Sequence, residues 1–183
     1  MKKIVSFVLA SVMSAAIFSS CGQKQTETKP AAVENPAVSQ KSESYEDALR
    51  ECFDSSFSLN GGEIFFSYMY PDAYIQDMKD KGEYDSAIET FNKNQIERPD
   101  LTDGKYAFGS IKEAVPVTDK QIAAVKSYFV DKCSDRIQLS EDDIDVKEGY
   151  EVSYSYTKNG EENGKDAALA IKLGDEGWKV IPA

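Results

Sequence analysis

The feature that most constrains this fold is a set of three segments near the end of the chain in which apolar and polar residues alternate. The first runs from Asp145 to Lys158, the second from Ala167 to Leu173 and the third from Trp178 to Ile181. Alternation with a period of two is typical of β-strands that bury one face. Turn-forming residues, Asn159-Gly160 and Gly174 to Gly177, follow the first two segments. The sequence therefore predicts an antiparallel meander of three strands.

The chain ahead of this meander is dominated by helical spacing of apolar residues. Helices are expected from Tyr45 towards Asn60, over Glu63–Tyr70, from Pro71 to Gly82 and from Glu83 to about Ile96. A loop is expected between Pro99 and Gly104. A strand follows over Lys105–Val117, with a kink at Gly109, and then a helix from Thr118 to about Cys133. Ser44 to Asp47 and Thr118 to Gln121 have the pattern of capping boxes. The predicted class is α+β.

This order of elements resembles the cystatin-like cone of the nuclear-transport-factor-like superfamily. The similarity rests on Tyr150–Tyr156, Leu169–Leu173 and the stretch Gly177-Trp178-Lys179-Val180. It is closest to exported lipoproteins whose last strands end in a glycine-containing turn followed by Trp-Lys-Val. The resemblance implies helices packed on a curved antiparallel sheet over residues 45–183. Many members of that group have no assigned activity, so the resemblance bears on fold more than on function.

The start of the chain has the pattern of an export signal. Lys2 and Lys3 precede a run without charge from Ile4 to Phe18, which is too short to span a bilayer comfortably. The stretch Phe18-Ser19-Ser20-Cys21 resembles the lipobox of bacterial lipoproteins, although Leu is usual at position 18 and Gly or Ala at position 20. The resemblance implies that residues 1–20 are a signal peptide, cut between Ser20 and Cys21. Lipid on the Cys21 thiol would then hold the protein on the extracytoplasmic face of the cell membrane or outer membrane.

Composition divides the rest of the chain into a tether and one domain. Residues 21–44 contain Pro30, Pro36 and many small polar residues, so they cannot bury enough apolar surface to fold and are predicted to be a disordered tether. Residues 45–183 have the length of one domain with one sizeable core. They hold 29 of the 32 acidic and 16 of the 21 basic side chains, a formal charge of −13. That charge disfavours nucleic acid as a partner.

Several kinds of site are disfavoured by the residues themselves. The chain has no histidine, which excludes histidine-based catalytic triads and histidine-containing zinc sites. The acidic run from Glu141 to Glu148 departs from an EF-hand loop because Lys147 occupies a ligand position, so a solvated loop is expected. Gly160 to Lys165 lacks the spacing and the hydroxyl of a phosphate loop. We therefore expect no metal and no cofactor.

Cys52 and Cys133 fall on the apolar stripes of two predicted helices. Two buried free thiols are expected, because free cysteine is commonly a small core residue. A disulfide between them is the alternative in an exported protein.

The leading functional hypothesis is a membrane-anchored, non-catalytic binding module for a small molecule or a protein partner. Tyr68, Tyr154 and Trp178 are the candidate ligand contacts, and a homodimer formed through the sheet is a further expectation. One alternative is a cone-type enzyme of the isomerase, dehydratase or hydrolase kind, which would place a buried carboxylate opposite a tyrosine in an open pocket. Another, based on charge alone, is an inhibitory or immunity lipoprotein that neutralises a basic toxin.

Overall fold

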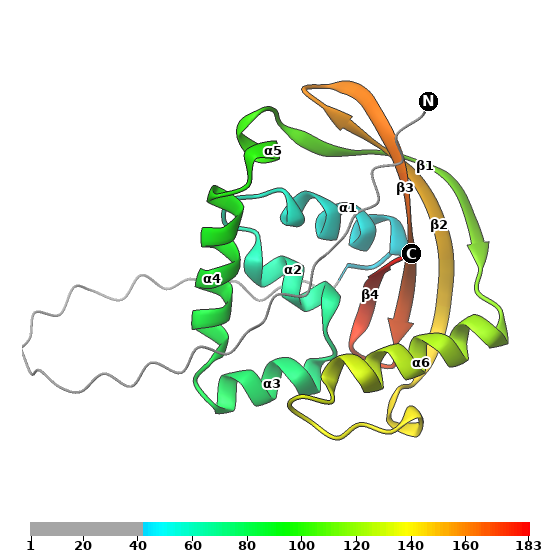
Figure 1. The fold of residues 1–183 in the computed structure, drawn as a ribbon. Coiled ribbons are helices and arrows are strands. Elements are labelled where there is room, and N and C mark those ends of the chain that lie inside the picture. The colour runs from blue at the N-terminus through cyan, green and yellow to red at the C-terminus, as the bar shows by residue number, and fades with distance from the viewer. Residues whose placement is uncertain (1–41) are drawn as a thin grey trace, which may run out of the picture. The chain divides into compact units, whose positions relative to one another are not determined.

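The computed structural model describes residues 42–183. The predicted signal peptide, the lipobox cysteine Cys21 and most of the predicted tether lie outside these residues. The elements in chain order are α1 (Tyr45–Ser56), α2 (Gly62–Met69), α3 (Asp72–Asp80), α4 (Tyr84–Ile96), α5 (Pro99–Thr102), β1 (Tyr106–Pro116), α6 (Asp119–Cys133), a 3₁₀ turn η1 (Glu141–Asp143), β2 (Val146–Lys158), β3 (Glu161–Leu173) and β4 (Gly177–Pro182). The predicted α+β class is confirmed (Figure 1). The short elements α5 and η1 fall where loops were expected.

The four strands form one antiparallel sheet in the order β1-β2-β3-β4. The sheet is open, with β1 and β4 at its edges. The predicted kink at Gly109 is present as a shift in the β1–β2 register between Phe108 and Ile111. A Cβ atom at Gly109 would lie 2.8 Å from the backbone oxygen of Ser155. Only glycine therefore fits this bulge without moving the neighbouring strand.

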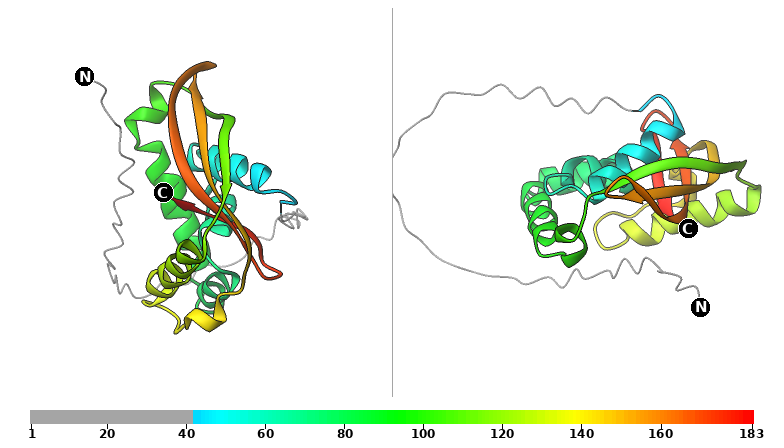
Figure 2. Two further views of the ribbon diagram at one scale, coloured as in Figure 1. Left: turned by 90° about the vertical axis from the view of Figure 1, so that its right-hand side faces the viewer. Right: turned by 90° about the horizontal axis from the view of Figure 1, so that it is seen from above.

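The β2–β3 hairpin is longer than the sequence suggested. Strand β3 begins at Glu161 rather than Ala167, because Lys158 pairs with Glu161 across a two-residue turn. Asn159 and Gly160 both have positive φ, 55° and 85°, as that turn requires. β4 pairs with β3 only from Ala168 onwards, so the tip of the hairpin extends past β4 (Figure 2). Residues 161–163, two glutamates and an asparagine, are exposed there, and their polarity hid the strand from the pattern of alternation.

The helix starts that were predicted from capping residues are confirmed. Ser44 Oγ accepts a hydrogen bond from the backbone N–H of Asp47 at 3.1 Å and so caps α1. At α6, Thr118 and Gln121 form the complete capping box, with each side chain bonded to the other residue's backbone N–H. Pro71 directly precedes α3. Each contact satisfies backbone groups that a helix start leaves without partners.

Apolar side chains cover both faces of the sheet. On one face Val152, Tyr154, Ala168, Ala170, Trp178 and Val180 belong to the core cluster that also contains Leu49, Cys52 and Phe53 of α1 and Phe66 and Met69 of α2. On the other face Ile171, Leu173 and Ile181 pack with Val125 and Phe129 of α6. The period of two along β3 assigns neighbouring residues to opposite clusters. Helices α1 and α2 thus cover one face, and α6 covers part of the other.

Candidate functional site

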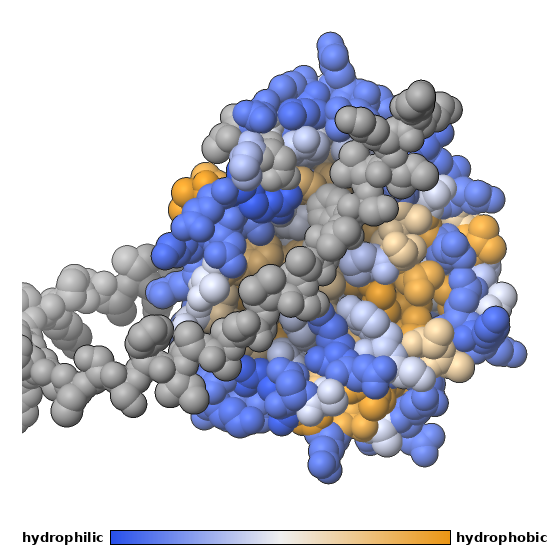
Figure 3. All heavy atoms as spheres, in the orientation of Figure 1, coloured by the Kyte–Doolittle hydropathy of each residue, from blue (hydrophilic) through white to orange (hydrophobic). Residues whose placement is uncertain are grey.

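A groove lies where the ends of α1 and α4 meet α5 and the start of β1. Its volume is about 480 Å³, and its apolar lining comes from Phe57, Leu59, Ile96, Leu101 and Tyr106. Leu59 and Ile96 are 52% and 63% exposed, although both are large aliphatic residues. We call this feature the α4–β1 groove. Figure 3 shows an apolar area near the place where α4 meets α5, one of several apolar areas on this face of the molecule.

Arg98 holds the two helix ends that form the groove. Its guanidinium donates hydrogen bonds to the backbone oxygen of Ser56, at 3.1 Å, and to Oε1 of Gln95, at 2.9 Å. The same guanidinium lies over the ring of Phe57, 5.1 Å from its centroid. Because these contacts link the end of α4 to the end of α1, the groove wall is built from fixed elements.

The floor of the groove continues into β1 through aromatic stacking. The rings of Phe57 and Tyr106 are stacked with centroids 4.9 Å apart. The ammonium of Lys158 lies 5.2 Å from the centroid of the Tyr106 ring, and Lys105 lines the groove directly. The groove therefore combines an apolar lining with two lysines beside it.

The three residues predicted to contact a ligand lie in the core rather than in this groove. Tyr68, Tyr154 and Trp178 are 5%, 7% and 5% exposed and belong to one core cluster. Tyr154 stacks on Phe108 at 5.2 Å, and Trp178 lies 6.3 Å from the ring of Tyr150. The structure thus brings them into one cluster, with Tyr154 and Trp178 on the same face of the sheet, but none lines the α4–β1 groove. Their role as ligand contacts stays a prediction.

Tyr68 and Glu51 form a pair of tyrosine and carboxylate like the one that a cone-type enzyme would need, but this pair does not lie in an open pocket. The Tyr68 hydroxyl donates to Oε2 of Glu51 at 2.6 Å and lies 2.5 Å from Oγ of Ser42. Burial raises the pKa of the Tyr68 hydroxyl, and the hydrogen bond to Glu51 raises it further. Glu51 itself is exposed. The pair therefore sits at the surface of α1 and α2 and not in a deep pocket.

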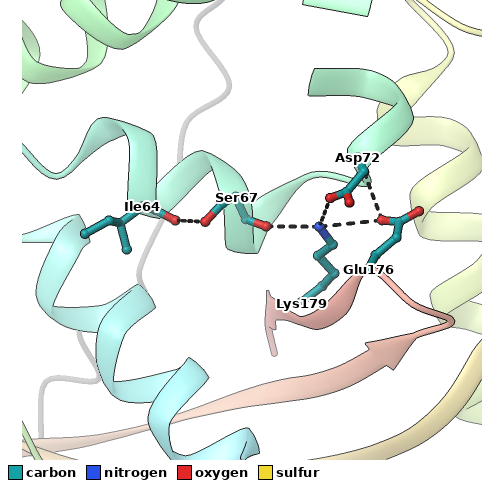
Figure 4. Close-up of polar contacts among 5 residues, drawn as sticks. All are labelled: Ile64, Ser67, Asp72, Glu176 and Lys179. Atoms are coloured by element: carbon teal, nitrogen blue, oxygen red, sulfur yellow. Dashed lines mark hydrogen bonds and ion pairs between the residues drawn. The ribbon is translucent and has the colours of Figure 1, made fainter. Parts of the chain in front are cut away.

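A second polar cluster surrounds the buried lysine of β4 (Figure 4). The side chain of Lys179 is 2% exposed. Its Nζ lies 3.1 Å from the backbone oxygen of Ser67, 3.0 Å from Oδ1 of Asp72 and 3.5 Å from Oε2 of Glu176. Glu176 also accepts the backbone N–H of Asp72 at 2.8 Å, at the start of α3. This cluster joins β4 to the end of α2 and the start of α3.

Sequence reasoning missed the Lys179 cluster because two of its partners, Ser67 and Asp72, lie more than a hundred positions away in the chain. One signal was available: Lys179 stands between Trp178 and Val180, within a strand that is otherwise apolar. A lysine in a buried strand requires a partner for its charge. The α4–β1 groove has no comparable signal, because Leu59 and Ile96 each fall at the end of a predicted helix.

The two cysteines are free and buried, as expected. Burial raises the pKa of the Cys52 thiol to about 12 and that of the Cys133 thiol to about 11. Both thiols are therefore protonated near neutral pH and poor nucleophiles.

The acidic run before β2 has local partners of its own. Asp143 accepts the backbone N–H of Ser140 at 2.8 Å, and Glu141 accepts the hydroxyl of Ser127 at 2.6 Å. Over residues 42–183, no three or more Asp, Glu, Cys or His side chains are grouped so that they could bind a metal ion. In the same part of the chain no helix is both long and apolar enough to cross a bilayer.

Comparison of the chain with models of known protein families, with curated proteins and with solved structures found no match.

Proposed function

We propose that this protein is a membrane-anchored lipoprotein of the cell envelope, and that its domain is a non-catalytic binding module with the α4–β1 groove as its ligand-binding site. The observation that carries the proposal is the exposure of Leu59 and Ile96, at 52% and 63%, in a concave surface. Covering such side chains is favourable by about 25 cal/mol for each Å² removed from water. The groove volume of about 480 Å³ falls within the usual range for small-ligand sites.

The anchoring part of the proposal rests on the sequence before the described residues. Two lysines, a short apolar run and Phe18-Ser19-Ser20-Cys21 together have the form of a lipoprotein signal. A diacylglyceryl group on the Cys21 sulfur would supply two acyl chains. Two chains hold a protein stably on a membrane, because each buried methylene contributes about 0.8 kcal/mol. The location would be the extracytoplasmic face of the cell membrane or outer membrane.

The non-catalytic part is supported by the state of the buried reactive groups. The Tyr68 hydroxyl is already engaged with Glu51, and Lys179 is engaged with three oxygens. The raised pKa values of the Cys52 and Cys133 thiols keep them protonated. A general acid or base works best with a pKa near the operating pH, and the raised pKa values of the Tyr68 hydroxyl and the two thiols move these groups away from that condition.

The cystatin-like cone is part of the same proposal, supported by the order of helices, strand, helix and three-strand meander. In this structure α1 and α2 cover one apolar face of the sheet. Self-association through the sheet stays a prediction.

The binding proposal is tested by methyl NMR on the full-length chain with Cys21→Ser, which carries no lipid. Decyl maltoside, a nonionic amphiphile, is titrated below its micelle concentration. We expect saturable shifts at the methyl groups of Leu59, Ile96 and Leu101, and recovery of the probe unchanged. Ile64 and Val115, which are 45% and 48% exposed outside the groove, are the internal controls. Equal shifts at groove and control methyl groups, or no shifts at all, would show that the groove does not bind.

A further inference from the structure

We propose that the ligand of the α4–β1 groove is an amphiphile with an anionic head group, such as a fatty-acid carboxylate. This inference rests on the proposed function and specifies the chemistry of its ligand. The tail would contact Leu59, Ile96 and Leu101 in the groove, and the head group would contact Lys105 and Lys158.

The apolar part of the groove fits a flexible tail better than a flat ring. Its lining combines three aliphatic side chains, Leu59, Ile96 and Leu101, with the rings of Phe57 and Tyr106. The two rings stack on each other, so each covers one face of the other. The most exposed surface belongs to the aliphatic residues Leu59 and Ile96, which bind by buried area and without directional contacts.

The charged side chain that lines the groove is a lysine, although the domain as a whole is acidic. Residues 45–183 carry a formal charge of −13, yet Lys105 lines the groove and Lys158 lies over Tyr106 at its floor. Among the side chains that the structure describes, no carboxylate forms an ion pair with either lysine. Their ammonium groups are available to an anion, and an exposed ion pair of this kind contributes modestly but sets orientation.

The position of the two lysines matches the polarity of such a ligand. Lys158 and Lys105 lie beside Gly104, where a Cβ atom would be 2.6 Å from Cε of Lys158. Ile96 is the last residue of α4, and Leu59 lies in the turn that follows α1. The apolar contacts for the tail and the charged contacts for the head group therefore come from different segments of the chain, which suits the separate ends of an amphiphile. Glu97 and Asp103 are also exposed in this part of the chain, so a cationic amphiphile is the decisive comparison.

The test compares three probes that share a decyl tail: decanoate, decyltrimethylammonium and decyl maltoside. Each is titrated by calorimetry and methyl NMR into the full-length Cys21→Ser chain, below its micelle concentration. We expect all three to shift the methyl groups of Leu59 and Ile96, with decanoate binding most tightly. Raising the salt concentration should weaken only the preference for decanoate.

Two pairs of variants assign the contacts. Lys105→Gln should weaken decanoate binding by about two- to fivefold, the range of an exposed ion pair, and leave decyl maltoside unaffected. Lys120→Gln, on the exposed side of α6, is the matched control and should change neither. Ile96→Ser should weaken all three probes, whereas Val115→Ser should weaken none.

The experiment distinguishes failure of the anionic-ligand inference from failure of the proposed binding function. Equal affinity for the three probes at the groove would overturn the anionic ligand but leave the binding module standing. Tighter binding of decyltrimethylammonium would also overturn the anionic ligand, since Glu97 and Asp103 rather than the lysines would then set the preference. If no probe shifts the groove methyl groups, the proposed function fails together with this inference.

Discussion

Replacing Lys179 should destabilise the domain in a way that separates the contributions of its charge and its carbon chain. The side chain is 2% exposed and its ammonium contacts Ser67, Asp72 and Glu176. In Lys179→Met most of the buried stem is kept and the polar contacts are lost. In Lys179→Ala both are lost. The two variants therefore form a series within one site.

The magnitudes follow from these contacts. Loss of the charged hydrogen bonds, with the Ser67 carbonyl left without its donor, should cost about 1–3 kcal/mol in Lys179→Met. Asp72 and Glu176 limit this cost because their side chains are 52% and 33% exposed and can be hydrated again. Lys179→Ala also removes three buried methylenes at about 0.8 kcal/mol each, offset in part by regained side-chain entropy. We expect a total of about 2–4 kcal/mol.

The assay is urea unfolding followed by circular dichroism and by the fluorescence of Trp178. The matched control is Lys147→Ala, which breaks an ion pair with Asp145 at 2.7 Å in which both side chains are 58% exposed. That change should leave the urea midpoint where it is, because exposed pairs contribute little. If Lys179→Met is as stable as the unchanged chain while Lys179→Ala is not, only the stem stabilises the fold and the cluster contributes nothing.

Four further predictions concern the rest of the domain. Gly61→Ala should destabilise the domain by about 1–3 kcal/mol, as overpacking does, because the new Cβ would meet the backbone oxygen of Ser55. Asn60→Ala is the control, and equal urea midpoints for the two variants would contradict the clash. Ellman's reagent should find Cys52 and Cys133 unreactive in the native protein and both reactive after unfolding without reductant, whereas two missing thiols would indicate a disulfide. Because the raised thiol pKa values favour the neutral form in the fold, the contribution of the two thiols to stability should be constant below pH 9 and fall as the pH rises towards 11 and 12, so that the alkaline loss is less steep in Cys52→Ala and Cys133→Ala. A chain of residues 44–183 should be soluble and unfold cooperatively with Trp178 emission typical of a buried indole, since Trp178 is 5% exposed; emission at the solvent-exposed wavelength in native buffer would contradict that placement.

The sequence predicted most of the fold because local signals coincide with element boundaries. Ser44 and Thr118 cap helices, Pro71 precedes one, and the alternation through Tyr150 to Tyr156 marks a strand with one buried face. The start of β3 could not be predicted in this way. At the hairpin tip the residues that follow Gly160 face water, so no alternation in hydrophobicity reports the strand.

The candidate site was much less predictable than the fold. Tyr68, Tyr154 and Trp178 are the predicted ligand contacts, but large aromatic residues are equally suited to a packed core, and the core is where they lie. The α4–β1 groove depends on how the ends of α1 and α4 meet β1. That is a long-range arrangement held by Arg98 and by the stack of Phe57 on Tyr106. Neither contact has a signature in the spacing of residues.

The central claim, that this protein is anchored to a membrane through one sulfur atom, is tested most directly by labelling with a clickable fatty acid in a bacterial host. The unchanged chain and its Cys21→Ala variant are compared by label uptake, membrane fractionation and intact mass. We expect the unchanged chain to take up label, to begin at Cys21 and to fractionate with membranes, while the variant takes up none. Equal uptake and equal membrane association of the two chains would contradict the lipoprotein assignment.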